Sequence, residues 1–289
     1  MKLLNTAVLA LSLSFSLLFP HPAIAGFDEG LAAFNNQDYA TALREWRPLA
    51  DQGDADAQKN LGLMYANGWG VSQDYKQAMK WFRLVAEQGI STGQRILGIM
   101  YENGQGVPQD YKEAMKWYRL AANQGDDGAQ NNLGSMYEGG RGVPQNYHEA
   151  VKWYRMAADQ GNAIMQVNLG IMYETGRGVP QDYKQAVTWY RLAANQGNPI
   201  AQLNLGVRYE YGEGVPANKV VAYALYSLSA SSDSTAGTKA SSNLTDLTDS
   251  MSVKEIAVAQ GLTSEMSKSG NLLKALDKYA KNSPIKAKN

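Results

Sequence analysis

The sequence predicts an all-α protein built as a solenoid of repeated helix pairs. The first observation is an internal repeat, because Val71–Tyr75 returns as Val107–Tyr111, Val143–Tyr147 and Val179–Tyr183 at a constant step of 36 residues. The second is that apolar residues between these copies follow helical spacing. A fixed period of about 20–50 residues is typical of proteins that stack identical supersecondary units.

The N-terminal segment, residues 1–25, is predicted to be a signal peptide. Lys2 is followed by an apolar run over 7–19, and a small-x-small pattern ends at Ala25, after which we expect cleavage. The run is too short for a membrane span, which requires about 20 apolar residues. Because no cysteine follows for lipid attachment, we expect a periplasmic or secreted protein that is neither a lipoprotein nor membrane-spanning.

Each repeat is predicted to contain two helices, as in 54–67 (helix A) and 74–88 (helix B). Asp74 and its copies suit the N-cap of helix B, and Gln77 and its copies stand where they complete a capping box. Gly89 and its copies suit a left-handed residue after helix B. A Gly-x-Gly-Val-Pro turn connects the two helices and requires the conformational freedom of glycine at two positions.

The expected core lies on one face of helix A, where Ala57, Leu61 and Tyr65 follow helical spacing. Gly62 and its copies lie beside this face. A glycine inside a helix costs about 1 kcal/mol relative to alanine, so its regular return indicates that an aromatic ring of a neighbouring helix approaches closely. Such a ladder is also compatible with a sugar or base platform, but its helical spacing beside alanines favours a core role. The candidate rings are Trp81, Trp117, Trp153 and Trp189, then Phe82, Tyr118, Tyr154 and Tyr190.

The repeat pattern divides the chain into units. Residues 26–53 are predicted to be a shorter N-terminal capping unit, 234–281 a helical C-terminal cap and 282–289 a tail, since the end units of a solenoid differ from its inner repeats. The five full repeats are predicted at 54–89, 90–125, 126–161, 162–197 and 198–233.

Composition limits the chemistry that the chain can perform. Its 289 residues include 27 basic and 27 acidic side chains, and this neutrality argues against a nucleic-acid partner. Cysteine is absent, which excludes disulfides, thiolate zinc sites, iron–sulfur clusters and cysteine nucleophiles. His21 and His148 are the only histidines. We therefore expect no catalytic residues, no metal site and no cofactor.

The repeat consensus A-Q-x-x-L-G-x-M-Y-x-x-G-x-G-V-P-Q-D-Y-x-x-A-x-x-W-Y-R-x-A-A-x-Q-G resembles the SEL-one-like repeat, a relative of the tetratricopeptide repeat. The copy from Ala129 to Gly161 matches it closely, and the resemblance covers about 27–233. It implies a right-handed α-solenoid of antiparallel helix pairs that acts as a scaffold for other proteins. Some cysteine-rich members are described as penicillin-binding or β-lactamase-like, and this chain lacks their paired cysteines.

A binding surface is predicted on helix A. At about 100° per residue, a core position for Leu61 places Asn60 and Leu63 on the far side, which lines the concave groove of a stacked solenoid. Asparagine can donate to and accept from a peptide backbone, and the apolar residues would contact its side chains. The alternative is that these apolar residues pack on neighbouring A helices. This helix A strip comprises Asn60, Leu63, Ile96, Ile99, Asn132, Ser135, Asn168, Ile171, Asn204 and Val207.

Two further surfaces are candidates. The middle residue of the Gly-x-Gly turn varies between repeats, and an exposed tryptophan there could hold a partner, although Trp69 could instead cover Trp46 and Phe82. Basic residues along helix B, such as Lys76, could contact anionic lipid or peptidoglycan, or form a solvated face balanced by Glu102 and its copies. The candidates for loop contact are Trp69, Arg141 and Arg177.

These observations predict an exported, non-enzymatic repeat scaffold that binds a protein or peptide in the bacterial envelope. One alternative is a secreted factor that contacts a host protein. Another is a hydrolase of cell-wall or β-lactam substrates, which no nucleophile–base pair in the sequence supports. Neither the identity of the partner nor the oligomeric state follows from the repeat, because solenoid surfaces change specificity without changing their pattern.

Overall fold

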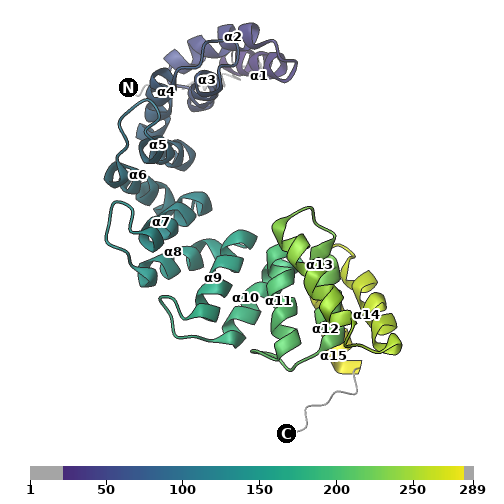
Figure 1. The fold of residues 1–289 in the computed structure, drawn as a ribbon. Helices are drawn as coiled ribbons and strands as arrows, with labels where there is room; N and C mark the ends of the chain where they lie inside the picture. The colour runs from purple at the N-terminus through teal and green to yellow at the C-terminus, as the bar shows by residue number, and fades with distance from the viewer. Residues whose placement is uncertain (1–21, 283–289) are drawn as a thin grey trace, which may run out of the picture. The chain divides into compact units, whose positions relative to one another are not determined.

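The computed structural model describes residues 22–282, and all regular secondary structure in this range is α-helical (Figure 1). The prediction of an all-α solenoid of helix pairs is therefore confirmed. The helices are α1 (Pro22–Asn35), α2 (Tyr39–Asp51), α3 (Ala55–Asn67), α4 (Tyr75–Glu87), α5 (Ser91–Asn103), α6 (Tyr111–Asn123), α7 (Asp127–Gly139), α8 (Tyr147–Asp159), α9 (Ala163–Thr175), α10 (Tyr183–Asn195), α11 (Pro199–Tyr211), α12 (Lys219–Ala230), α13 (Thr235–Thr248), α14 (Val253–Met266) and α15 (Leu272–Asn282).

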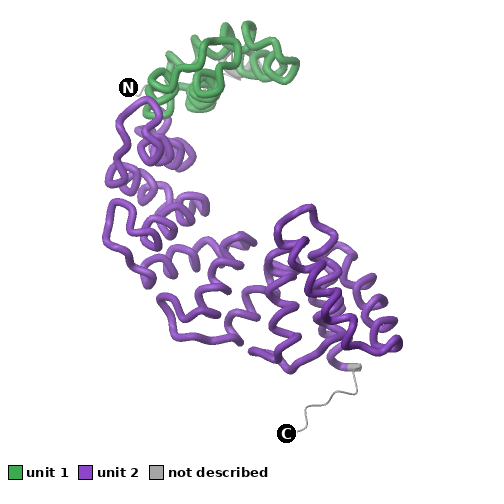
Figure 2. The backbone as a smooth tube through the Cα atoms, in the orientation of Figure 1, with its two compact units in different colours: residues 1–84 green, residues 85–289 purple. Residues whose placement is uncertain are grey.

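The chain forms two compact units, residues 1–84 and 85–289 (Figure 2). The first has a core in which Trp46, Leu61 and Trp81 are buried. In the second, α5 to α12 are four successive helix pairs, and α13, α14 and α15 follow them. Here α13 and α14 pack on α12, while α15 contacts α14 and α10. Each unit therefore has its own hydrophobic core.

The predicted signal peptide is largely outside the described part of the chain. Residues 1–21 lie outside it, and Ala25 is placed within α1. Of the predicted tail 282–289, only its first residue belongs to the described range. Within residues 22–282, none of the helices is both long enough and apolar enough to cross a membrane.

The helix B start signals are confirmed in part. The side chain of Asp110 accepts hydrogen bonds from the backbone of Lys112 (2.9 Å) and Glu113 (3.0 Å) and so caps α6. The predicted capping box is wrong, because the backbone N–H of Asp110 already donates to the Tyr101 carbonyl at 2.9 Å. The Glu113 carboxylate bonds Lys116 instead. At the other end, Gly125 adopts the expected positive φ of 90°.

The mid-helix glycines are explained by aromatic rings, as predicted. A Cβ built on Gly134 of α7 would lie 2.4 Å from Cε1 of Tyr154 on α8. The corresponding glycines of the other repeats make the same approach to rings: Gly62 to Phe82, Gly98 to Tyr118, Gly170 to Tyr190 and Gly206 to Tyr226. The rings that lie against the glycines therefore belong to the series Phe82, Tyr118, Tyr154 and Tyr190. The tryptophans pack elsewhere, as Trp189 shows by joining the core formed by α8 and α9.

Each of these tyrosines ends in a hydrogen bond to a glutamate on helix A. Tyr154 lies across Gly134, and its hydroxyl donates to Glu138, one helical turn further on, at 2.8 Å. The same bond joins Tyr118 to Glu102, Tyr190 to Glu174 and Tyr226 to Glu210 at 2.6–2.7 Å. The direct partners of these glutamates are therefore tyrosine hydroxyls of helix B. The position of each glutamate follows from the tyrosine, because the buried tyrosine hydroxyl requires a hydrogen-bond acceptor inside the helix pair.

A buried glutamine ladder joins successive repeats. Gln130 is only 1% exposed, and its side-chain NH2 donates to the Ala122 carbonyl at the end of α6 at 3.1 Å. Its side-chain oxygen accepts a hydrogen bond from Gln160, the residue after α8, at 2.9 Å. Gln94 and Gln166 repeat this arrangement with Gln124 and Gln196. The ladder satisfies polar groups that would be costly to bury without partners, and it ties each helix pair to its neighbour.

We expect Gly134→Ala to destabilise the protein. The added methyl must displace the Tyr154 ring, and overpacking of this kind typically costs about 1–3 kcal/mol, against a gain of about 1 kcal/mol in helix propensity. Urea unfolding followed by circular dichroism measures the difference. The matched control is Gly261→Ala in α14, where a Cβ meets nothing within 4 Å. It should stabilise the chain, and equal effects of both substitutions would contradict the packing explanation.

We also expect stability to fall in alkaline solution. Burial and then the hydrogen bond to Glu174 raise the pKa of Tyr190 above its usual value near 10, and the other three tyrosines of this series are raised for the same two reasons. The unfolded chain therefore loses these protons first. The stabilisation is complete below about pH 10 and declines as pH rises toward the folded pKa.

The measurement is the urea midpoint between pH 8 and pH 11. The matched variant replaces Tyr118, Tyr154, Tyr190 and Tyr226 with Phe, and it should show a shallower decline above pH 10 even if its stability at pH 8 is lower. An identical slope in both proteins would assign the alkaline loss to other groups.

Candidate peptide-binding surface

The helix A strip lies at the boundary between core and solvent. All ten of its side chains are partly buried in the structure. Asn60 and Leu63 belong to α3 in the first unit, and the other eight are distributed over α5, α7, α9 and α11 in the second. Ile99, Ile171 and Val207 pack against the core clusters beneath them. The apolar half of the strip therefore contributes to packing while it keeps an accessible edge.

Part of the polar half of the strip already has partners. The side chain of Asn132 lies near the Tyr118 hydroxyl and that of Asn204 near the Tyr190 hydroxyl, where each lowers the pKa of the phenol. These two asparagines are thus placed beside buried tyrosines. Asn168 is placed differently, because its side chain lines a cavity.

The loop arginines reach the same surface as the strip. Nη1 of Arg141 is 2.5 Å from Oε1 of Glu102, in the preceding repeat, and its Nη2 donates to the Ser135 hydroxyl at 2.8 Å. Arg177 faces Glu138 at 3.8 Å in the same way. The sequence had presented the strip and the loops as two surfaces. The structure makes them one surface in the second unit, because each loop folds back toward the preceding repeat.

The second glycine of the turn fixes this direction. Gly178 has a φ of 71°, and a Cβ there would lie 2.3 Å from the Tyr147 carbonyl oxygen at the start of α8. Only a residue without a side chain allows this approach. The turn after α9 is thereby pressed against the first turn of α8, which carries the preceding residue, Arg177, toward Glu138.

A cavity of about 140 Å³ marks the place where strip and loop meet. Arg177 is the more available of the two loop arginines, because its side chain is 52% exposed and its contact with Glu138 is long. The cavity therefore combines a guanidinium, a carboxylate and a carboxamide over an apolar floor. Its lining consists of Glu138, Tyr154, Asn168, Ile171, Met172 and Arg177.

The adjoining repeat changes this arrangement. Arg208 of α11 is buried, and its Nη1 lies 3.5 Å from Glu174 and 2.8 Å from Glu213. The guanidinium here comes from helix A, and the loop supplies a carboxylate. Charge at the corresponding position thus differs between repeats whose backbone is the same. Such variation lets a regular scaffold distinguish the residues of a ligand.

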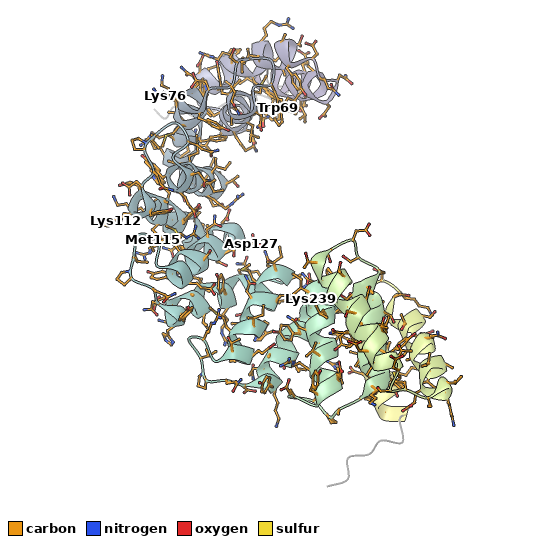
Figure 3. All side chains as sticks on the ribbon, in the orientation of Figure 1. Trp69, Lys76, Lys112, Met115, Asp127 and Lys239 are labelled. Atoms are coloured by element: carbon orange, nitrogen blue, oxygen red, sulfur yellow. The ribbon has the colours of Figure 1, made fainter. Side chains whose placement is uncertain are left out.

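Trp69 contributes to the core of the first unit (Figure 3). Its ring centroid lies 5.3 Å from that of Phe34 and 6.3 Å from that of Tyr39, and its side chain is partly buried. These contacts agree with a covering role. The lysines of helix B are exposed, whereas its arginines reach other helices, as Arg119 does by donating to the Tyr137 hydroxyl and Arg191 by pairing with Asp277. Lys112 projects away from α6 in Figure 3, while Lys152 bonds Glu149.

Comparison with known proteins identifies the repeat. The chain matches the Sel1 repeat at residues 55–90, 91–126, 128–162, 163–198 and 199–234. Among solved structures, it is similar to a protective antigen present in uropathogenic Escherichia coli strains that displays the SLR fold. The two share 35% identity with a TM-score of 0.76, over 92% of this chain and 58% of that one. This chain therefore spans less than two thirds of the antigen's length.

A Sel1 repeat protein from Oxalobacter formigenes is also similar, with 33% identity and a TM-score of 0.69 over 74% of this chain and 88% of that chain. A search of curated proteins gave no match. Sel1 repeats form scaffolds that are typical of protein–protein interaction. Because the matched repeats cover more than half of the sequence, the chain belongs to the Sel1 repeat family.

Proposed function

We propose that this protein is an exported, non-enzymatic scaffold that binds a protein or peptide of the bacterial envelope. The observation that carries the proposal is the cavity beside Asn168, Ile171 and Arg177, where the helix A strip and a loop arginine meet. Membership of the Sel1 repeat family supports a binding role. The N-terminal pattern that ends at Ala25 supports export.

An extended peptide suits the groups at this surface. Arg177 would bind a carboxylate or backbone carbonyl of the peptide, and its guanidinium can form two parallel bonds to a carboxylate. Asn168 offers both a donor and an acceptor for the peptide backbone. Ile171 would contact an apolar side chain. Repetition of related groups every 36 residues would let the peptide follow several repeats.

The residues of the cavity suit binding better than catalysis. Burial and the hydrogen bond to Glu138 raise the pKa of Tyr154, so that its hydroxyl stays protonated at neutral pH and is a poor nucleophile. Both carboxylate oxygens of Glu138 have partners, because Oε2 accepts a hydrogen bond from the Tyr154 hydroxyl and Oε1 lies 3.8 Å from Nη1 of Arg177. Assays of nitrocefin and muropeptide turnover would detect the hydrolase that we consider the alternative.

A second candidate is a secreted factor that contacts a host protein. The similarity to a protective antigen of uropathogenic Escherichia coli strains favours it. Both candidates use the same binding surface and differ in the compartment where the partner lies. Fractionation into periplasm and medium would separate them.

Binding through the cavity predicts a loss of partner in a triple variant, Asn168→Ala, Ile171→Ala and Arg177→Ala. We expect recovery of envelope proteins with the tagged chain to fall about tenfold or more, because the charged, polar and apolar contacts of one site are removed together. Quantitative mass spectrometry after affinity purification measures it. The control is Lys184→Ala with Thr188→Ala, both on exposed positions of α10. Equal recovery from a folded triple variant would contradict the proposed surface.

Export predicts a mature protein that begins at Gly26. Intact-mass measurement of the protein from the periplasm or the medium should show loss of residues 1–25. Ala25→Tyr should block processing, because signal peptidase requires a small residue at that position. Recovery of the unprocessed natural sequence from the cytoplasm would refute export while leaving a binding role intact.

A further inference from the structure

We propose that a second surface, separate from the helix A strip, binds a segment of a partner protein in which two apolar side chains flank a lysine. The inference rests on the proposed scaffold function. We call this surface the apolar edge, and it is formed by Leu120, Met156 and Leu192 at the ends of α6, α8 and α10.

The apolar edge is exposed at the same position of three consecutive repeats. Leu120, Met156 and Leu192 are 48%, 44% and 40% exposed, whereas the other large apolar side chains of these helices are buried or partly buried. A single exposed leucine requires no explanation. Recurrence at a step of 36 residues places the three side chains in one row, and exposed apolar rows are typical of interaction sites.

The first turns of the following A helices extend the edge. The Ser229 hydroxyl donates to the Pro199 carbonyl at 2.8 Å, which places the start of α11 beside the end of α12. In the same repeats, Ile164 and Ile200 of α9 and α11 are 62% and 46% exposed. Asp127, labelled in Figure 3, marks the start of α7, the helix that follows α6. Apolar residues thus come from both helices of a pair.

The chain itself covers the fourth position of this row. Leu228 stands 36 residues after Leu192 and is only partly exposed, because it packs against the core cluster that contains Met266 and Leu272. These three side chains and Lys268 line a common cavity of about 520 Å³. The segment that connects α14 to α15 therefore shows that two apolar side chains fit the row. Lys268 stands between them and lines the same cavity, while its amine pairs with Glu265 at 2.7 Å.

Polar contacts hold this internal segment next to the edge. The backbone N–H of Leu273 donates to the Asn195 side chain at 3.2 Å, and Arg191 pairs with Asp277 at 2.7 Å. Asn195 is replaced by Asp159 one repeat earlier, beside Met156. A carboxylate at that position favours a basic occupant. We therefore assign to the edge an occupant that resembles residues 266–272 of this chain and belongs to another protein.

The probe is a synthetic peptide with the sequence of residues 262–275. Fluorescence anisotropy should show saturable binding of the labelled peptide to the full chain. The variant Leu120→Gln, Met156→Gln, Leu192→Gln should bind it about tenfold more weakly or worse, and circular dichroism verifies its fold. The matched control carries Tyr211→Gln, Val253→Gln and Val258→Gln, which remove exposed apolar groups away from the edge. It should bind within about twofold of the natural sequence.

Methyl NMR locates the bound peptide. Its addition should shift the methyl signal of Met156 and leave that of Met136, which is fully buried, unchanged. A peptide in which Met266, Lys268 and Leu272 are replaced by Gln should not bind. This arm remains decisive even if the triple variant of the chain fails to fold.

Three results would overturn the proposal: no saturable binding up to about 1 mM, equal binding by the triple variant, or shifts confined to other methyl groups. Dimerisation of the chain that the triple variant abolishes would also overturn it, since the occupant would then be a second copy. Because the strip residues are unchanged in these proteins, failure here leaves the recovery of envelope partners intact. Failure of the scaffold function would abolish that recovery.

Discussion

The packing of one aromatic ring across one glycine determines the geometry of every repeat. Gly134 lets the ring of Tyr154 lie against the backbone of α7, at a distance that any Cβ would prevent. This close approach brings α7 and α8 together and buries a phenol. Because a buried hydroxyl requires a partner, Glu138 stands one helical turn further along and accepts its hydrogen bond. The cost of a glycine inside a helix is thus offset by tertiary packing.

The candidate binding surface follows from the same contact. The glutamate that accepts the tyrosine hydroxyl is also the residue toward which the loop arginine of the next repeat reaches, as Glu102 with Arg141 and Glu138 with Arg177 show. In each of these repeats, the tyrosine hydroxyl, the glutamate and the loop arginine therefore form a single polar cluster beside the helix A strip. Where Arg208 replaces the loop arginine, the backbone stays the same and the charge pattern changes. A constant frame with variable surface groups is what a binding scaffold requires.

The last repeat shows how the solenoid is completed. Helices α13, α14 and α15 cover α12 and reach back to α10, where Arg191 meets Asp277. The side chain of Leu228 is thereby partly covered. At the same position of the inner repeats, Leu120, Met156 and Leu192 remain exposed to solvent. The same repeat position thus occurs in a covered and an open form within one unit, which is why the chain supplies a template for what the open positions can bind.

The sequence by itself determined the repeat period, the two helices of each unit, the Asp110 cap and the close approach at Gly134, because these depend on local or strictly periodic signals. It did not determine which aromatic series fills the glycine gap, since Trp and Tyr are neighbours and both suit a core. Only the tertiary structure showed that the Asp110 backbone donor is already used by Tyr101, and that Arg141 and the helix A strip share one surface. The physical reason is that these contacts join residues outside the helices to residues of a helix up to 39 positions away, where helical periodicity carries no information about which groups meet.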